Sequence, residues 1–315
     1  MTRHAACLAL LLTLAPAARG QDVGYSGMVR IADDAYLTVN DRKSGIQPGD
    51  RLGILTVTAK GTTFHPLPVA HWLDPVEKEP NDLEAVCALP ERPGEFLLGE
   101  SGQYKKKYGR LFHVRVTRDA DGWRAECLKA FKLPRAEPDD TGTTWPGDEL
   151  EGMACRPGGK DVPTLVLGAR GGQGRVGLQP ARLVWGDLNL TTYTFTPRGT
   201  HALPPVPGFA GARGCADLHL VEIDRGWEVW SVAVRDDGDA GPFHSVVYRA
   251  GVLGTLKDGT WGFTAEARPS VRLHLHGLKV EALAAPPRCV PRAGFAVATD
   301  DENYGGVWRP LFPSP

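Results

Sequence analysis

The chain has 315 residues with 36 Lys and Arg against 37 Asp and Glu, a balance that argues against a nucleic-acid binder, because such proteins usually carry a basic excess. Its 38 Gly and 26 Pro argue against an all-helical fold, since both residues interrupt helices. General disorder is excluded as well, because 42% of the residues are hydrophobic and the 8 Trp can build a large core.

The N-terminus has the three-part pattern of a secretory signal peptide. Arg3 and His4 precede an apolar run over residues 5–15, and small residues follow up to Gly20. This run is too short to cross a bilayer as a stable helix, and no later segment offers about 18 consecutive apolar residues. We therefore expect a signal peptide over residues 1–20, no transmembrane segment, and a single exported domain over residues 21–315, either secreted or periplasmic.

Five cysteines remain after the signal peptide, namely Cys87, Cys127, Cys155, Cys215 and Cys289. Export places them in an oxidising compartment, and their odd number requires a free thiol or a pair between two chains. No two of them have the C-x-x-C spacing typical of a zinc site. We interpret most of them as buried, unreactive side chains, and their pairing is left open.

Five apolar runs recur along the chain, and each ends at a charged residue. The runs cover residues 36–41, 96–100, 165–170, 230–236 and 295–300. A shorter strand precedes each of the last four runs and recurs about every 60–70 residues. These shorter strands begin with Asp82-Leu83-Glu84, Glu149-Leu150-Glu151, Asp217-Leu218-His219 and Lys279-Val280-Glu281, and Tyr25-Ser26-Gly27 is a weaker first copy.

A unit of about four antiparallel strands that recurs five times predicts an all-β fold, a five-bladed β-propeller around a central channel. Six blades are one alternative, if two short blades are merged in this count, and two stacked β-sandwiches are another. A parallel α/β fold would need helical segments of about 10–15 residues between the strands, and the sequence has no convincing one. Because the fifth unit runs out of chain, we expect residues near Gln21–Tyr25 to complete it and close the ring.

In each predicted blade the start of the first strand lies beside the end of the second, so charged residues should gather at one face. The first strands contribute a ring of Ser26, Glu84, Glu151, His219 and Glu281, and the second strands end in a ring of Asp41, Glu100, Arg170, Asp236 and Asp300. Crowded carboxylates must take up protons, pair with Arg or Lys, or bind a cation. Ca²⁺ is the simplest cation for such oxygen ligands, and it would be held by Glu84, Glu151, Glu281, Asp236 and Asp300. Salt bridges and turn hydrogen bonds without an ion are the alternative.

At these residues the chain resembles the phytase-like, or esterase-like, β-propeller family, whose exported bacterial members have a D-x-E-G-type motif on the first strand and an acidic end on the second. Glu149-Leu150-Glu151-Gly152 is the closest copy, and the resemblance covers most of residues 25–310. It implies a propeller and an association with Ca²⁺. The fourth repeat departs from the pattern with His219 and the third with Arg170, which puts a ring of carboxylates alone in doubt.

We expect a module that binds a small-molecule or envelope ligand at the acidic face, with Asp41, Glu100, Arg170 and Lys279 contacting the ligand. The alternative is a cation-assisted hydrolase of phosphoesters or esters that uses the same face. There His219 would act as a general base and Arg170 would stabilise developing negative charge. We expect a monomer that does not bind nucleic acid.

Two further motifs are interpreted as structural. Residues 172–177 match G-x-G-x-x-G, but Pro180 and a strand follow instead of a helix, so we expect a hairpin loop and no dinucleotide site. His274 and His276 share one face of an extended segment, yet the sequence shows no third metal ligand beside them, which favours a plain strand edge. Neither a G-x-S-x-G nor an H-E-x-x-H motif occurs, so hydrolases of those classes are not supported.

Overall fold

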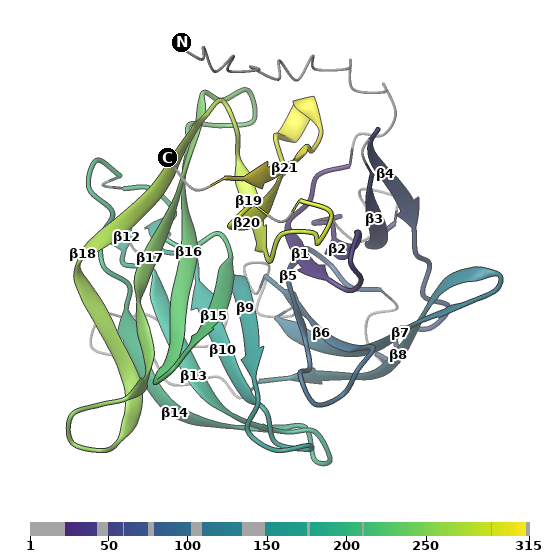
Figure 1. Cartoon of the computed structure of the whole chain (residues 1–315), viewed down its shortest axis with the longest axis horizontal. Coiled ribbons are helices and arrows are strands. Elements are labelled where there is room, and N and C mark those ends of the chain that lie inside the picture. The colour runs from purple at the N-terminus through teal and green to yellow at the C-terminus, as the bar shows by residue number, and fades with distance from the viewer. Residues whose placement is uncertain are drawn as a thin grey trace, which may run out of the picture.

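A computed structural model describes residues 23–42, 50–58, 60–74, 79–101, 109–133, 149–174, 177–209, 211–290 and 292–312. These residues form five antiparallel sheets arranged around a common centre (Figure 1). This confirms the predicted five-bladed β-propeller. The predicted signal peptide lies outside the described residues.

The first three blades each have four strands that pair in antiparallel order. In blade 3 a short hairpin, β11 (Gly172–Gly174) and β12 (Gly177–Gln179), is inserted before the third strand. The sequence predicted a hairpin for this G-x-G-x-x-G segment. Blade 1 contains β1 (Gly27–Arg30), β2 (Ala35–Val39), β3 (Leu52–Thr58) and β4 (Gly61–Pro66). Blade 2 contains β5 (Leu83–Ala88), β6 (Glu95–Glu100), β7 (Arg110–Asp119) and β8 (Gly122–Lys132). Blade 3 contains β9 (Leu150–Arg156), β10 (Thr164–Ala169), β13 (Arg182–Asn189) and β14 (Thr194–Ala202).

The last two blades differ in size. Blade 4 has the longest strands, namely β15 (Leu218–Ile223), β16 (Gly226–Asp236), β17 (Phe243–Thr255) and β18 (Trp261–His276). Blade 5 has three strands, β19 (Val280–Ala284), β20 (Phe295–Thr299) and β21 (Trp308–Leu311), and a 3-10 turn over Glu302–Tyr304. No helix in the described part of the chain is long and apolar enough to cross a membrane.

The first strands of the five blades form the inner wall of the ring. Each of β1, β5, β9, β15 and β19 contacts the first strand of the next blade, and β19 contacts β1. The expected closure by residues near Gln21–Tyr25 is wrong for the described part of that segment, because residues 23–25 form no strand. Only the Tyr25 N–H donates a backbone hydrogen bond to the Thr299 carbonyl, at 3.0 Å. Among the described residues, blades 5 and 1 are joined by the packing of β19 against β1 and by this hydrogen bond.

The apolar cores lie between neighbouring sheets. In one of them Leu183 and Trp185 of blade 3 pack in the same buried cluster as Val246 and Tyr248 of blade 4. The second strands β2, β6 and β20 are buried along their whole length, as expected for strands covered on both faces. Near the centre the sheets approach so closely that a Cβ at Gly152 would lie 2.8 Å from the Leu218 amide nitrogen.

The described cysteines are all free thiols. Cys87, Cys127 and Cys215 are buried, in agreement with the sequence interpretation, whereas Cys155 is half-buried and Cys289 is exposed. The Cys87 and Cys155 sulfur atoms lie 3.2 Å apart across the boundary between blades 2 and 3. The structure thus brings together two thiols that the sequence could not pair.

Candidate functional site: the charged mouth of the channel

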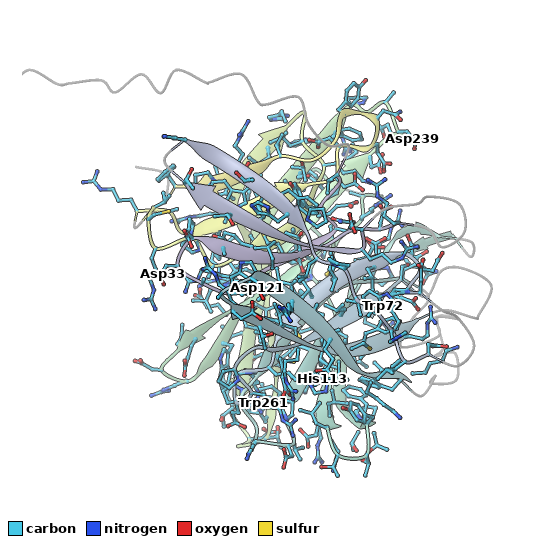
Figure 2. All side chains as sticks on the ribbon, turned by 90° about the vertical axis from the view of Figure 1, so that its right-hand side faces the viewer. Asp33, Trp72, His113, Asp121, Asp239 and Trp261 are labelled. Carbon is cyan, nitrogen blue, oxygen red and sulfur yellow. The ribbon has the colours of Figure 1, made fainter. Side chains whose placement is uncertain are left out.

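The candidate site lies where the first strands begin and the second strands end. Figure 2 shows the two faces from the side, with Asp33 in the β1–β2 turn on one and Asp239 in the β16–β17 loop on the other. We call the Asp239 side of the channel its mouth. Its polar groups are Asp41, Asp82, Glu84, Glu151, Asp236, Glu281, Asp300, Arg170, Arg213 and Lys279.

Three glutamates reach the mouth because each lies at a β-bulge. In β5, β9 and β19 the pairing with the second strand skips one residue, and the skipped residues are Glu84, Glu151 and Glu281. Such β-bulges redirect a side chain out of the regular alternation and are frequent beside active sites. The first strands of blades 1 and 4 pair with their second strands without a bulge. The sequence repeat at these three glutamates is therefore also a repeat of backbone geometry.

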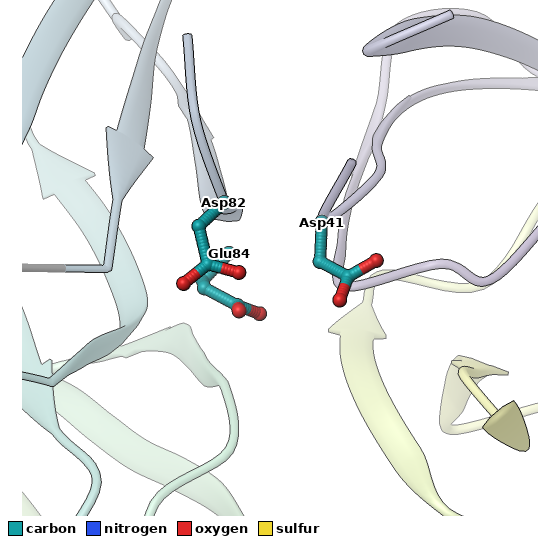
Figure 3. A group of neighbouring side chains, drawn as sticks. All are labelled: Asp41, Asp82 and Glu84. Carbon is teal, nitrogen blue, oxygen red and sulfur yellow. The ribbon is translucent and has the colours of Figure 1, made fainter. Parts of the chain in front are cut away.

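Asp41, Asp82 and Glu84 form the tightest acidic group of the described residues. Each can place one carboxylate oxygen within 4.8 Å of one from each of the other two. Figure 3 shows Asp82 and Glu84 on blade 2 facing Asp41, which follows the second strand of blade 1. Asp82 has φ 62°, in the left-handed region that few residues other than Gly, Asn and Asp adopt. Backbone strain of this kind tends to occur where a side chain is held for function.

Glu84 carries the strongest charge conflict of the mouth. Burial raises its pKa well above the usual range, and the carboxylates of Glu151, Asp82, Glu281 and Asp41 raise it further. Within the described ranges its carboxylate accepts no hydrogen bond and forms no ion pair. The positive charge of Arg213 acts on Glu84 without forming an ion pair with it. A proton or a bound cation would relieve the remaining repulsion.

Glu151, Asp236 and Glu281 have cationic neighbours. The Arg213 guanidinium lies 3.1 Å from Glu281 and 3.0 Å from Asp236. The Lys279 ammonium lies 3.0 Å from Glu281, and Arg170 lies 3.6 Å from Glu151. These carboxylates and cations therefore form a network of ion pairs, which is the arrangement expected if no metal ion is bound. Glu84 has no ion pair within the described ranges.

Two carboxyl groups of the mouth are poised to exchange protons near neutral pH. Burial raises the pKa of Glu151 to about 7, against the opposing effects of Arg170 and Arg213. Burial also raises the pKa of Asp300 to about 7, with Glu281 and Asp41 adding to the shift. The pKa values of both groups thus lie well above those of ordinary carboxyl groups.

Two residues predicted for the site are held elsewhere. Glu100 is fully buried, and its oxygens accept hydrogen bonds from the Asn81 amide and from the amide and guanidinium of Arg110. His219 pairs in register with Trp230 and packs edge-on against Phe295. Burial lowers its pKa to about 4, with a further contribution from Arg30, and the structure does not bring it together with the carboxylates.

The remaining predicted residues do meet at the mouth. Of the five predicted metal ligands, Glu84 belongs to the group with Asp41 and Asp82, and the other four lie around it. The ligand residues predicted beside them, Asp41, Arg170 and Lys279, lie there as well.

Sequence reasoning missed Arg213. It precedes β15 and pairs by a single bridge with Val234, so blade 4 turns an arginine toward the mouth. The available signal was an Arg four residues before Asp217 in the fourth motif. A cavity of about 240 Å³ opens beside it, lined by Arg170, Gly171, Gly211, Ala212, Arg213, Val234, Arg235, Asp236 and Asp237.

The site and the sheet topology define a five-bladed β-propeller with a charged channel mouth. No model of a known protein family matches the sequence, and no curated protein matches it.

Solved propeller enzymes are similar in structure. A GH32 β-fructofuranosidase from Bombyx mori has a TM-score of 0.45 and 11% identity, over 91% of this chain and 59% of its own. A putative exo-β-1,3-galactanase from Bifidobacterium bifidum has a TM-score of 0.47 and 10% identity, over 94% of this chain and 89% of its own. A sucrose-6-phosphate hydrolase from Lactobacillus gasseri has a TM-score of 0.44 and 11% identity, over 91% of this chain and 60% of its own. At this similarity the comparisons carry no argument about the activity of this chain.

Proposed function

We propose that the protein is a binding module whose channel mouth holds a divalent cation, most simply Ca²⁺, through Asp41, Asp82 and Glu84. The observation that carries this proposal is the position of Glu84, which has four carboxylates around it and forms no ion pair in the described ranges. The donors suit the ion, because Ca²⁺ prefers several carboxylate and neutral oxygens. Two buried oxygens of blade 1 at the same end, Ser26 Oγ and Asn40 Oδ1, also have no hydrogen-bond partner among the described residues.

The ligand of this module is proposed to be anionic. A cation at Glu84 would leave open coordination positions for an acidic ligand. The neighbouring cavity presents Arg170, Arg213 and Arg235, whose guanidinium groups match carboxylate or phosphate oxygens. The ion and the arginines together would hold a small acidic molecule, or an acidic group of an envelope component.

Millimolar Ca²⁺ is expected to raise the melting temperature of the chain. Ligand present at 100 times its dissociation constant adds about 2.7 kcal/mol to the free energy of unfolding. The increase should be larger at pH 8 than at pH 5, because Glu84 must lose its proton to bind the ion. Thermal unfolding with chelator and with Ca²⁺ measures both effects.

Glu84→Gln and Asp41→Asn are expected to abolish the Ca²⁺ effect and to leave the fold intact. Glu222→Gln is the matched control, because Glu222 is an exposed residue near the far end of the first strand of blade 4. The proposal is wrong if Ca²⁺ leaves the wild-type melting temperature unchanged at pH 8, or if Glu84→Gln responds as the wild type does.

A second candidate function is acid–base hydrolysis at the same mouth. It is favoured by Glu151, whose pKa of about 7 allows it to donate a proton to a leaving group at neutral pH. Glu281 lies near enough to raise the pKa of Glu151 by charge repulsion, and it forms ion pairs with Arg213 and Lys279. Glycoside hydrolases use two carboxyl groups, one as general acid and the other as base or nucleophile.

Under this candidate, turnover of aryl esters, aryl phosphates or aryl glycosides is expected to fall tenfold per pH unit well above pH 7, because the acid form of Glu151 is lost. Glu151→Gln is expected to lower kcat by at least about 100-fold, and Glu222→Gln to leave it unchanged. The measurement is a pH profile of kcat in the presence and absence of Ca²⁺. No turnover of any of the three substrate classes would leave only the binding module.

A further inference from the structure

Three histidines meet at the outer edge of blade 4. His244 stands at the start of β17, and His274 and His276 stand at the end of β18. The sequence showed only the pair on β18, with no third ligand beside it. The antiparallel pairing of the two strands places His244 directly opposite His276, with Val246 opposite His274.

The side chains of the three histidines share one face of the sheet. Residues two apart on a strand point the same way, and directly paired residues of neighbouring strands do so as well. The His244 and His276 rings stack with their centroids 4.0 Å apart, and the His244 and His274 centroids are 5.5 Å apart. His274 and His276 are exposed and His244 is half-buried, so the group is open to solvent.

Two of the ring nitrogens already have the spacing of metal ligands. His244 Nε2 and His274 Nδ1 lie 3.3 Å apart. Two imidazole nitrogens bound to one tetrahedral Zn²⁺ at about 2.0–2.1 Å are separated by about 3.3–3.4 Å. His276 can supply the third nitrogen by turning its exposed ring, a motion that costs little for a surface side chain.

A cationic side chain and an aromatic ring flank His244. Arg235 lies on the neighbouring strand β16, directly opposite His244. Its guanidinium donates a hydrogen bond to the Gly208 carbonyl at 2.6 Å. Phe209 covers the inner side of the group with its ring centroid 4.7 Å from that of His244.

We propose that His244, His274 and His276 form a binding site for a divalent transition-metal ion such as Zn²⁺ or Cu²⁺. Imidazole nitrogen is a preferred ligand of these ions, whereas Ca²⁺ prefers oxygen. The site is separate from the channel mouth and does not depend on the function proposed there. A bound ion would tie the start of β17 to the end of β18, the two outer strands of the blade.

The test is calorimetric titration of the full chain with Zn²⁺ in millimolar Ca²⁺, which keeps the carboxylates of the mouth occupied. His244→Ala and His274→Ala are each expected to weaken Zn²⁺ binding at least about tenfold. His201→Ala is the matched control, because His201 is an exposed histidine on blade 3 whose ring contacts Phe263. Glu84→Gln should bind Zn²⁺ as the wild type does.

Cu²⁺ provides a second readout that does not depend on affinity. Its electron paramagnetic resonance spectrum is expected to show nitrogen couplings in the wild type and fewer of them in His276→Ala. Because His276 is exposed, this variant tests the site even if His244→Ala fails to fold. The proposal is overturned if Zn²⁺ affinity is unchanged in His274→Ala, or if binding is lost in Glu84→Gln and kept in both the His274 and His276 variants.

Discussion

Arg110→Met is expected to lower the free energy of unfolding by about 3–5 kcal/mol near neutral pH. The Arg110 guanidinium donates hydrogen bonds to Glu100 and Asp74, each with a 2.8 Å contact, and to the Glu79 carbonyl at 3.2 Å. Glu100 has no exposed surface, so removing Arg110 leaves a carboxylate without its counter-charge in the interior. The measurement is urea unfolding of the variant and the wild type.

The loss should depend on pH in a defined direction. Burial already raises the pKa of Glu100 in the folded wild type, and removing Arg110 raises it further because Arg110 opposes that shift. A carboxyl group with a raised folded pKa stabilises the protein at low pH and loses this contribution as the pH rises through the folded value. The deficit of Arg110→Met is therefore expected to be smaller at pH 5 than at pH 8.

Arg124→Met is the control for this prediction. Arg124 pairs with Asp119 and Asp121 on the surface hairpin of the same blade, and its side chain is 61% exposed. Exposed ion pairs of this kind contribute about 0–1 kcal/mol, so the control should stay close to the wild type at both pH values. Equal losses in the two variants, or a deficit for Arg110→Met that is larger at pH 5, would contradict the account.

The fold was predictable because the second strand of every blade contains a mostly apolar run. Strands covered on both faces lose the polar–apolar alternation and are recognised as blocks, and the blocks repeat. The run predicted over residues 36–41 contains most of β2, and the run over residues 295–300 contains all of β20. The fourth strand of the last blade was wrongly predicted, because a general count of strands per blade does not say how a ring is closed.

The residues of the mouth were predictable only where the position in the sequence motif coincides with a β-bulge in the backbone. Glu84, Glu151 and Glu281 share both the motif and the β-bulge, so all three reach the channel. His219 occupies the same place in the motif, but β15 pairs without a bulge and the side chain packs against Phe295 instead. A bulge depends on the partner strand and cannot be deduced from one short strand.

Contacts between distant segments could not be predicted from the sequence, because they also depend on how the strands pair. His244 lies 30 residues before His274, and only the register of β17 against β18 brings them together. Arg213 reaches Glu281 across a blade boundary, 68 residues along the chain. Residue types at a site can be proposed from a pattern, whereas the partner of each residue is fixed by the pairing of strands.

The two thiols that meet between blades 2 and 3 are expected to form a disulfide under oxidising conditions. Their sulfur atoms lie 3.2 Å apart, and a disulfide needs an approach to about 2.05 Å. With oxidised glutathione, each thiol gives up one proton and one electron, and the oxidant is reduced to two molecules of glutathione. Burial raises the pKa of Cys87, so the reaction should be faster at pH 9 than at pH 7.

Crosslinking Cys87 to Cys155 is expected to stabilise the protein by up to about 4 kcal/mol, because the bond closes a long loop and restricts the unfolded chain. The positions are 68 residues apart, so the loop spans an entire blade repeat. Melting temperatures after treatment with oxidised glutathione and with dithiothreitol measure the effect, and intact mass shows the loss of two hydrogens. Cys155→Ser should remove the difference, whereas Cys289→Ser, at an exposed thiol, should keep it. The prediction is wrong if the oxidised and the reduced wild type have the same melting temperature. It is also wrong if Cys155→Ser keeps the difference between them.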